Sequence, residues 1–467
     1  MIINIILYDN QNRNVFAEAW TRPDFAVILI LGFNMDTKTI DSKTQAFPLY
    51  LPLDNAAKIY PPAKGRRSPS MFRLSMELTE TVDREVLQLA LKGTLNRMPS
   101  FSQHLKRGFF WYHFEHSQEV LPISEEIRNP CVYLNVKKNK GFQFRVSCYG
   151  RRIAVDFFHV LTDGTGGMSF LKTLVAEYIS LRHGVIIPRG NGILDCEEPP
   201  LKTEYEDSFL KYAKPVTQSR YEKPAYHIKG TREEYGVIHI TTGIMSLSEV
   251  HAKAKEYGAT INEFLVASLI LSIYNIQRRE NHPFRRKQAI KVCIPINLRK
   301  HFPSHTLRNF TSYANLGIVP SLGDYTLEET IAIIRHGMAL EASKKNLTAK
   351  FSTNVASEKH WFLKIAPLYL KDPIMKLYFI MNGDRYNSIT LSNLGLVRLP
   401  EELEKYVERI SFMLGSGPNP ASCACVSYGD KLCFNITRTI EEPLVEKQFF
   451  TMLAGMGIKV TLESNRR

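Results

Sequence analysis

Alternating apolar and polar positions along the chain predict a series of β-strands. Residues 71–78 place Phe72, Leu74, Met76 and Leu78 on one face, as expected for a strand with one buried side. Residues 289–296 are apolar without alternation, which is typical of a strand buried on both faces. Further strands are predicted at 109–115, 132–136, 141–148, 152–158, 236–244, 388–394, 410–414, 421–428 and 431–436.

Helical spacing and capping residues predict the helices between these strands. A helix over 83–97 ends before Pro99, and a helix over 166–182 ends at Gly184. The predicted stripe of the first helix is Val86, Leu89, Ala90 and Gly93. Capping boxes of the S/T-x-x-E type open helices at 246–249, 260–263 and 326–329, the last running to about Lys345. The helix 261–277 is apolar nearly all round and is expected to be buried, and a helix over 444–455 closes the chain.

The order of these elements predicts two mixed α/β lobes. Strand, capped helix, several strands and helix occur in both halves, giving an α/β (α+β) fold of two sandwich-like lobes with mixed sheets. We expect an N-terminal lobe at 48–183, a linker rich in Pro, Gly and charge at 184–232, and a C-terminal lobe at 233–467. Residues 1–47 form an N-terminal extension of uncertain role, with strands predicted at 1–8 and 26–33; the segment lacks the basic start of a secretory signal.

Composition and charge narrow the classes of function. The chain has 467 residues, of which 44% are hydrophobic, and no apolar run approaches the ~18 residues that a membrane span needs. We therefore expect a soluble protein. The net charge of +14 attracts polyanions such as nucleic acid, acidic lipid, an acidic protein or a phosphorylated cofactor. Nucleic acid is disfavoured because no ribonucleoprotein, zinc-finger or basic-heptad pattern accompanies the charge. The basic clusters, which are also typical of solvated surface, are 64–67, 151–152, 278–279 and 285–287.

Cysteine and histidine spacing predicts no metal site. The seven cysteines are an odd number without the spacing of a secreted scaffold, which favours buried thiols and a cytoplasmic location. Cys423, Cys425 and Cys433 lack a fourth ligand nearby in sequence. His301 and His305 are separated by Pro303, so one helix cannot present both to a metal.

One constellation stands out as candidate chemistry, in residues 157–167. His159 falls at the carboxyl end of the predicted strand 152–158, and ligands tend to bind at such strand ends. Asp163 follows four residues later and can brace the loop, while nearby glycines would permit unusual backbone angles. A histidine near its reference pKa of ~6.5 suits deprotonation of an alcohol, amine or thiol. The alternative is a histidine satisfied in a turn beside an Asx-type bend.

These residues carry a family resemblance. His159-x-x-x-Asp163-Gly164, entered from an apolar strand and followed by a helix, resembles the active-site motif of the chloramphenicol-acetyltransferase-like superfamily. That superfamily includes condensation domains of peptide synthetases, plant BAHD acyltransferases, polyketide-associated acyltransferases and alcohol acetyltransferases. The segments 72–76, 82–98, 252–267, 295–299 and 308–310 resemble its other blocks in order, so the similarity spans about residues 50–460 and is closest to bacterial alcohol-acetyltransferase-like proteins.

The resemblance implies a two-lobed monomer with an active-site tunnel between the lobes. His159 would be the general base, Asp163 a structural residue paired with Arg299, and Gly164 the residue that allows a tight turn. Phe158 departs from the family, because condensation domains carry a second histidine at this place, and peptide condensation becomes less probable. The BAHD block Asp-Phe-Gly-Trp-Gly is absent from the sequence, and residues 392–395 occupy a roughly comparable place.

The predicted reaction is acyl transfer from a thioester to an alcohol or amine. Acyl-CoA would be the co-substrate, with no tightly bound cofactor, and the sequence does not identify its binding residues. Ser392, Asn393 and Asn309 are candidates for the oxyanion site or the tunnel, although Ser392 and Asn393 are also common turn residues. Two alternatives stay open: an acyl carrier protein as donor, and a non-catalytic relative that serves as a binding module.

Overall fold

The computed structural model describes residues 47–219, 222–359, 361–382 and 385–466. The strands predicted at 1–8 and 26–33 lie outside these residues. The unit described below begins at Phe47. Among the described residues no single helix is long and apolar enough to cross a bilayer. The helices α6 (Leu247–Glu256) and α7 (Ile261–Gln277) reach that length only together, across a 78° bend.

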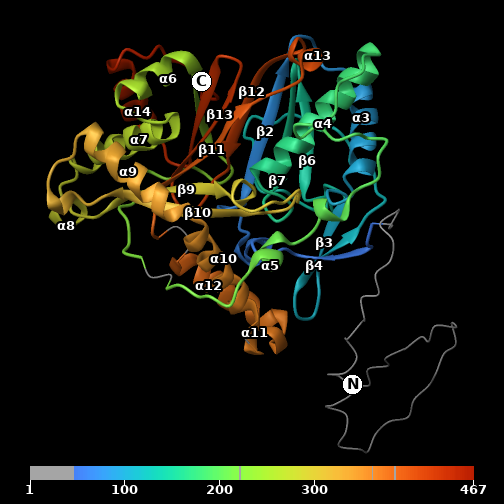
Figure 1. Cartoon of the computed structure of the whole chain (residues 1–467), viewed down its shortest axis with the longest axis horizontal. Coiled ribbons are helices and arrows are strands. Elements are labelled where there is room, and N and C mark those ends of the chain that lie inside the picture. Colours follow the sequence, from blue (N-terminus) through green and yellow to red (C-terminus); the bar gives the residue numbers. More distant parts are fainter. Residues whose placement is uncertain (1–46, 220–221, 360, 383–384, 467) are drawn as a thin grey trace, which may run out of the picture. The chain divides into compact units, whose positions relative to one another are not determined.

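The first large sheet is built around β2 and β7 (Figure 1). Its strand order is β12 (Val407–Leu414), β2 (Met71–Leu78), β7 (Arg152–Phe158), β6 (Phe144–Tyr149) and β5 (Ser124–Glu125). Only the β5–β6 pair is parallel. The apolar face of β2 packs against α4 (Gly164–His183), and α3 (Arg84–Arg97) packs on α4. The other face of β2 is buried as well, because Arg73 there is paired with Asp156.

The second large sheet carries the C-terminal half. Its strand order is β10 (Thr311–Ile318), β9 (Ile290–Asn297), β11 (Ile389–Val397), β13 (Ala421–Tyr428), β14 (Lys431–Arg438), β8 (His239–Ser246) and β15 (Thr461–Ser464). Strand β11 runs parallel to both of its neighbours and the other pairs are antiparallel. The core on this sheet includes α7 (Ile261–Gln277), whose residues are buried on all sides as predicted, with α14 (Leu444–Gly455) and α9 (Leu327–Glu341) packed on it. The described chain is thus a mixed α/β protein with two large mixed sheets.

The remaining elements are short or peripheral. A third sheet has the order β1 (Tyr50–Pro52), β4 (Tyr112–His116) and β3 (Gln103–Arg107). The other helices are α2 (Tyr60–Ala63), α5 (Ser208–Tyr212), α6 (Leu247–Glu256), α8 (Pro283–Arg286), α10 (Lys344–Lys359), α11 (Trp361–Ile365), α12 (Leu368–Asn382) and α13 (Glu401–Glu404). Single 3-10 turns are η1 (Ala57–Ile59), η2 (Lys202–Glu204), η3 (Leu298–Lys300) and η4 (Pro320–Leu322).

Several sequence predictions are corrected by the structure. Residues 132–136 form loop and turn instead of a strand, and the strand predicted at 109–115 begins only at Tyr112, because Phe109 and Phe110 lie in the connection between β3 and β4. Leu89 of the predicted α3 stripe is 61% exposed, because the buried side of that helix is formed by Leu87, Ala90 and Leu91 instead. Residues of strand β9 are alternately buried and half-buried, so one face of this strand is less buried than the sequence predicts.

Two features cross the predicted domain boundaries. Strand β12 lies late in the chain but pairs with β2, with Ile410 opposite Met76. Residues 184–232 contain α5, bury Phe209 and Tyr226, and place Glu204 in a bidentate ion pair with Arg97 at 2.7 Å. The boundaries themselves stay predictions, but the segment between the lobes is packed into the fold.

The glycines after His159 provide space, which differs from the predicted role. Helix α4 begins at Gly164, so Gly166 and Gly167 are helical, and none of the three has a positive φ. A Cβ on Gly166 would lie 2.0 Å from the Leu307 carbonyl oxygen, and one on Gly167 3.1 Å from the rings of Phe72 and Phe157. The close approach of the neighbouring segments therefore requires glycine here.

We expect Gly166→Ala to destabilise the protein by roughly 1–3 kcal/mol, because the methyl group overlaps a backbone oxygen that cannot move freely. Gly455 is the matched control: it also lies in a helix, and a Cβ there meets nothing within 4 Å. Gly455→Ala should leave stability unchanged or raise it by up to ~1 kcal/mol. Denaturant unfolding of the two variants measures the difference, and equal stabilities would contradict the packing role.

Candidate active site

His159 lies at the end of β7, where the chain turns into α4. Its backbone N–H donates to the Ser70 carbonyl at 2.9 Å, which fixes the turn to the start of β2. The imidazole stacks on Tyr60 with 4.8 Å between ring centroids and meets the ring of Phe72 at 5.2 Å, edge to face. The residue keeps partial exposure, whereas Phe157 and Phe158 before it are fully buried. Strand β7 thus ends in buried apolar residues, and His159 directly after them is half-buried.

A hydrogen-bond chain orients the imidazole. His159 Nδ1 lies 2.9 Å from Asn309 Oδ1, and Asn309 Nδ2 donates to Asp54 Oδ2 at 3.2 Å. An ionised carboxylate only accepts hydrogen bonds, so Asp54 fixes which end of the amide faces it. The Asn309 oxygen then faces the imidazole, and Nδ1 must carry the proton that it donates. The lone pair of the ring is therefore on Nε2.

Burial sets the ionisation of both ends of this chain. Desolvation lowers the pKa of His159 below its ordinary value of 6.5, and the opposing effects of Asp163 and Asn309 are smaller. Burial also raises the pKa of Asp54 to about 6, against the lowering effect of Arg308. At pH 7 to 8 the imidazole is neutral and Asp54 is ionised, which is the combination that the hydrogen-bond chain requires.

Asp163 joins the two halves of the chain through both carboxylate oxygens. Oδ1 caps α4 by accepting from the N–H groups of Thr165 and Gly166 at 3.1 and 3.0 Å. Oδ2 accepts from Arg299 Nη1 and the Phe310 N–H, both at 2.8 Å, and from the Thr311 hydroxyl at 3.0 Å. Burial alone would raise the pKa of Asp163, but Arg299 and these donors outweigh it and lower the pKa.

Arg299, the partner of Asp163, is also fixed by several hydrogen bonds. Its Nε donates to the Thr306 carbonyl at 3.0 Å, and its backbone N–H donates to Asn297 Oδ1 at 3.0 Å. Asn297 in turn donates to the Thr165 hydroxyl at 3.0 Å. The predicted partners Asp163 and Arg299 are thus in contact, and the connection between β9 and β10 is fastened to the start of α4.

The other predicted site residues are placed differently. Gly164 lies against Leu394, since a Cβ on it would be 2.8 Å from Leu394 Cδ2. Asn393 uses its amide locally, donating to Asn262 and accepting from the Gly395 N–H. Ser392 lies on β11, opposite Ala424 of β13. Among the described residues it is Asn309, and not Ser392 or Asn393, that hydrogen-bonds to the imidazole.

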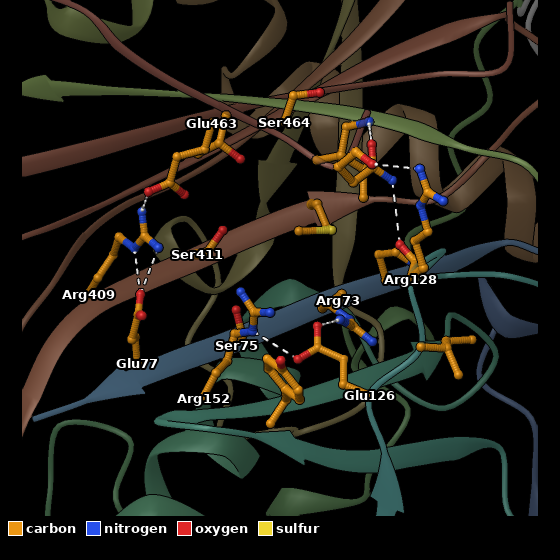
Figure 2. Close-up of a pocket in the computed structure, with 17 residues that line it drawn as sticks. Arg73, Ser75, Glu77, Glu126, Arg128, Arg152, Arg409, Ser411, Glu463 and Ser464 are labelled. Atoms are coloured by element: carbon orange, nitrogen blue, oxygen red, sulfur yellow. Dashed lines mark hydrogen bonds and ion pairs between the residues drawn. The ribbon is translucent and has the colours of Figure 1, made fainter. Parts of the chain in front are cut away.

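A polar cavity of about 490 Å³ lies between the two large sheets (Figure 2). Figure 2 shows side chains of β2 and β12 facing Glu463 and Ser464 of β15 across it. Its charged lining residues are Arg73, Glu77, Glu126, Arg128, Arg152, Arg409 and Glu463. His159 is not among the described residues that line it, so the tunnel expected at the histidine stays a prediction. The cavity begins at Arg73, about 10 Å along β2 from the Ser70 contact to His159.

The charges around this cavity are largely paired with one another. Glu126 lies 2.6 Å from Arg73 and 2.9 Å from Arg152, and Arg409 lies 2.7 Å from Glu77 and 2.8 Å from Glu463. Behind the lining, Arg73 and Arg145 both pair with the buried Asp156. Burial opposes ionisation of Asp156, but the two arginines outweigh it and hold its pKa at about 2. The cavity is therefore lined by charged side chains without a large excess of either sign.

One of the four basic clusters lies beside His159. In segment 60–70, Tyr60 stacks on the histidine and Lys64 Nζ is 4.4 Å from the ring centroid of Phe158. Arg66 and Arg67 are exposed, and the Arg66 guanidinium lies 5.7 Å from the ring centroid of Tyr235. Burial lowers the pKa of Lys64 to about 8, so it remains mostly protonated at pH 7. In the other clusters, Arg151, Arg152, Arg278 and Arg285 each have a carboxylate partner.

The cysteines have the surroundings of structural thiols. Cys423, Cys425 and Cys433 are buried and free, and burial raises the pKa of all three, which keeps them protonated. Within the described residues no group of three or more His, Cys, Asp or Glu side chains is arranged to hold a metal ion.

Tyr60 and Asp54 were not predicted as site residues. They lie about 100 residues before His159 in the sequence, in a segment whose short helices α2 and η1 leave no strong periodicity. The run Leu51-Pro52-Leu53-Asp54 marks only the start of the folded unit in the sequence. Nothing local links Asp54 to a histidine, because the link passes through Asn309 on a third segment.

Comparison with known proteins identifies the fold. No model of a known protein family matches the chain. Two uncharacterized proteins of Mycobacterium tuberculosis, from strains H37Rv and CDC 1551, are each 24% identical over 263 residues. The match covers 54% of this chain and 58% of each relative, so the chain spans less than two thirds of their length.

Solved structures match over a larger share of the chain. Polyketide synthase associated protein 5 from Mycobacterium tuberculosis is 15% identical with a TM-score of 0.57, covering 87% of this chain and 98% of that one. Trichothecene 15-O-acetyltransferase from Fusarium sporotrichioides is 13% identical with a TM-score of 0.56, covering 89% and 96%. The starter condensation domain of rhizomide synthetase, in complex with C8-CoA and Leu-SNAC, is 11% identical with a TM-score of 0.54, covering 87% and 94%.

The chain has the condensation-domain fold. This confirms the α/β fold predicted from the His159 motif, which in this structure has two large mixed sheets. In this acyltransferase-like fold, the described His159, Asp163 and Arg299 lie where β7, α4 and the β9–β10 connection meet.

Asp163→Asn should destabilise the protein by about 3–5 kcal/mol, because Arg299 would be left buried without its carboxylate partner. The wild-type advantage should shrink as pH falls below 3.8, since the lowered pKa of Asp163 gives stability only while it is ionised in the folded state. Asp83→Asn is the matched control: Asp83 also caps a helix and pairs with Arg182, but at the surface. Asp83→Asn should lower the free energy of unfolding by less than about 1 kcal/mol, measured by denaturant titration. Similar losses for both variants would contradict the role of Asp163.

Proposed function

We propose that this chain is an acyltransferase that moves an acyl group from a thioester to an alcohol or amine, with His159 as general base. The observation that carries the proposal is how the imidazole is held: Nδ1 lies 2.9 Å from Asn309 Oδ1, which leaves the lone pair on Nε2. Desolvation lowers the pKa of the ring below 6.5, which favours its neutral form at pH 7, and the residue is partly exposed. A base in this state can accept a proton at neutral pH without first losing one.

The reaction follows from that lone pair. Nε2 accepts the proton of the acceptor hydroxyl or amine while its oxygen or nitrogen bonds to the thioester carbonyl carbon. The tetrahedral intermediate then collapses, the carbon–sulfur bond breaks, and the imidazolium returns the proton to the departing thiolate. The positive charge that forms on the ring is stabilised by the Asn309 oxygen and by the nearby Asp163 carboxylate. The oxyanion role of Ser392 and Asn393 stays a prediction.

Acyl-CoA is the proposed donor. The basic cluster beside the site, formed by Lys64, Arg66 and Arg67, would attract the phosphates of coenzyme A while the thioester extends toward His159. A protein of the same fold was solved with C8-CoA, and another is named as an O-acetyltransferase, which supports this choice of donor and an alcohol acceptor. A carrier protein would offer the same thioester on a phosphopantetheine arm and is the second donor to test.

His159→Ala should lower kcat/KM by roughly 10²–10⁴-fold, because the base is removed while folding contacts at the site remain. In the wild-type protein kcat/KM should rise with pH through a midpoint below 6.5, since desolvation lowers the pKa of His159 and only the neutral ring accepts the proton. Release of free thiol from acetyl-, malonyl- and long-chain acyl-CoA, with a panel of alcohols and amines, measures both effects.

Two further variants separate a catalytic role from a structural one. His183→Ala removes a surface histidine paired with Glu80 and should leave turnover unchanged. Asn309→Ala should lower kcat by less than His159→Ala does. It should also move the acid limb of the pH–rate profile to lower pH, because the hydrogen bond that Nδ1–H donates to Asn309 Oδ1 raises the pKa of the ring. Full activity of His159→Ala would refute the assignment of the base.

Removing Arg66 and Arg67 together should raise KM for acyl-CoA by roughly 3- to 30-fold with little change in kcat, as expected for two exposed phosphate contacts. An acyl-N-acetylcysteamine thioester lacks the phosphates and should show no change in KM. Arg278→Ala with Arg279→Ala removes another exposed arginine pair outside this cluster. It should change KM for neither acyl-CoA nor the N-acetylcysteamine thioester. Equal effects on both thioesters would exclude a phosphate-binding role for the cluster.

A further inference from the structure

Helix α12 presents an apolar face outward, opposite to the usual arrangement of a surface helix. Its exposed residues recur at helical spacing and form one continuous stripe, which consists of Tyr369, Leu370, Pro373, Ile374 and Leu377. Ile374 is 55% exposed and Leu377 58% exposed. The inner side of the helix is formed by Leu368 and Lys371, which are buried. A single exposed leucine is ordinary, but a continuous apolar stripe of this length indicates an interaction surface.

The β3–β4 connection extends this stripe. Phe109 is 67% exposed and contacts Phe110 edge to face, and the Leu368 N–H donates to the Phe109 carbonyl at 2.8 Å. Lys371 binds the helix to the same connection: its Nζ donates to the Phe110 carbonyl at 2.8 Å and lies 3.7 Å from the ring centroid of Trp111. The connection and the helix are therefore bound to one another and form one platform, seen in the lower part of Figure 1 near α11 and α12.

Two exposed lysines and two paired cations lie beside the apolar stripe of the platform. Lys364 lies on α11 and Lys376 at the edge of the α12 stripe; both are exposed, and neither forms an ion pair with a described residue. Lys106 and Arg107 lie at the base of the β3–β4 connection. The carboxylates nearby are already engaged, Asp372 by Arg107 and the Tyr112 hydroxyl, and Glu115 by Lys106 and His113. Because Lys106 and Arg107 are neutralised by these carboxylates, the excess positive charge of the rim comes from Lys364 and Lys376.

The platform adjoins the candidate active site. Helix α12 packs against α2, and Tyr60 at the start of α2 stacks on His159. The side-chain contacts of α12 with the β3–β4 connection are made by Lys371 and Asp372, which are not part of the exposed stripe.

We infer that this platform docks the protein on an anionic lipid bilayer. An apolar stripe with a cationic rim matches the interface between acyl chains and acidic headgroups, where such surfaces insert their apolar side chains and attract the negative surface. Neither α11 nor α12 is long enough to cross a bilayer, so the platform would lie on the membrane surface. The consequence for catalysis rests on the proposed function: a lipid-soluble thioester or acceptor would reach His159 directly from the bilayer beside α2.

Vesicle sedimentation of the full chain tests the inference without any substrate. Vesicles of phosphatidylcholine with added phosphatidylglycerol should bind the wild-type protein, and vesicles of phosphatidylcholine alone should bind it less. Ile374→Glu with Leu377→Glu should weaken binding at least about tenfold, because charge replaces the centre of the stripe. Lys364→Gln with Lys376→Gln should reduce only the part of binding that depends on phosphatidylglycerol and is lost at high salt.

The matched control is Ile186→Glu with Leu322→Glu, which charges two exposed apolar residues outside the platform and should bind as the wild type does. Equal losses in both glutamate pairs, or no vesicle binding by the wild type, would overturn the inference. So would a dimer in vesicle-free solution that Ile374→Glu with Leu377→Glu dissociates, since the stripe would then join two copies. His159→Ala should bind vesicles normally, so failure of acyl transfer and failure of docking are separate results.

Discussion

The arrangement of the site depends on one buried carboxylate. Asp163 caps α4 with one oxygen and binds Arg299, Phe310 and Thr311 with the other, so a single side chain fixes the start of a helix in one lobe against the β9–β10 connection of the other. Its burial is favourable only because each lone pair has a donor. Since Asn309 directly precedes Phe310, the same contacts set the position of the amide that holds His159.

The histidine illustrates how distant segments determine the chemistry of one ring. The choice of Nδ1 as the protonated nitrogen is made by Asp54 through Asn309, and the lowered pKa comes from the aromatic rings of Tyr60 and Phe72 packed around it. These groups come from two parts of the chain, residues 54–72 and residue 309, each more than 80 residues from His159. A neutral imidazole with a defined tautomer is therefore a product of the tertiary fold.

Sequence patterns predicted much of the fold and one part of the site. Strands β2, β7 and β13 and helices α7 and α14 were bounded correctly, because each is strongly periodic or clearly capped. The pair Asp163–Arg299 followed from the family resemblance. The orienting chain through Asn309 to Asp54 was not predictable, because hydrogen bonds between loops leave no periodicity. The glycines of α4 were misjudged for a related reason: their requirement for space comes from Leu307 and from Phe72 and Phe157, and no backbone angle at the glycines themselves reveals it.

The pairing of β12 with β2 has a consequence for synthesis of the protein. Strand β12 leaves the ribosome more than 300 residues after β2, which at ordinary elongation rates amounts to roughly 20–70 s. Throughout that interval the nascent N-terminal lobe has an unprotected sheet edge with open N–H and C=O groups. We therefore expect the newly made chain to depend on chaperones, and an N-terminal fragment produced by itself to aggregate.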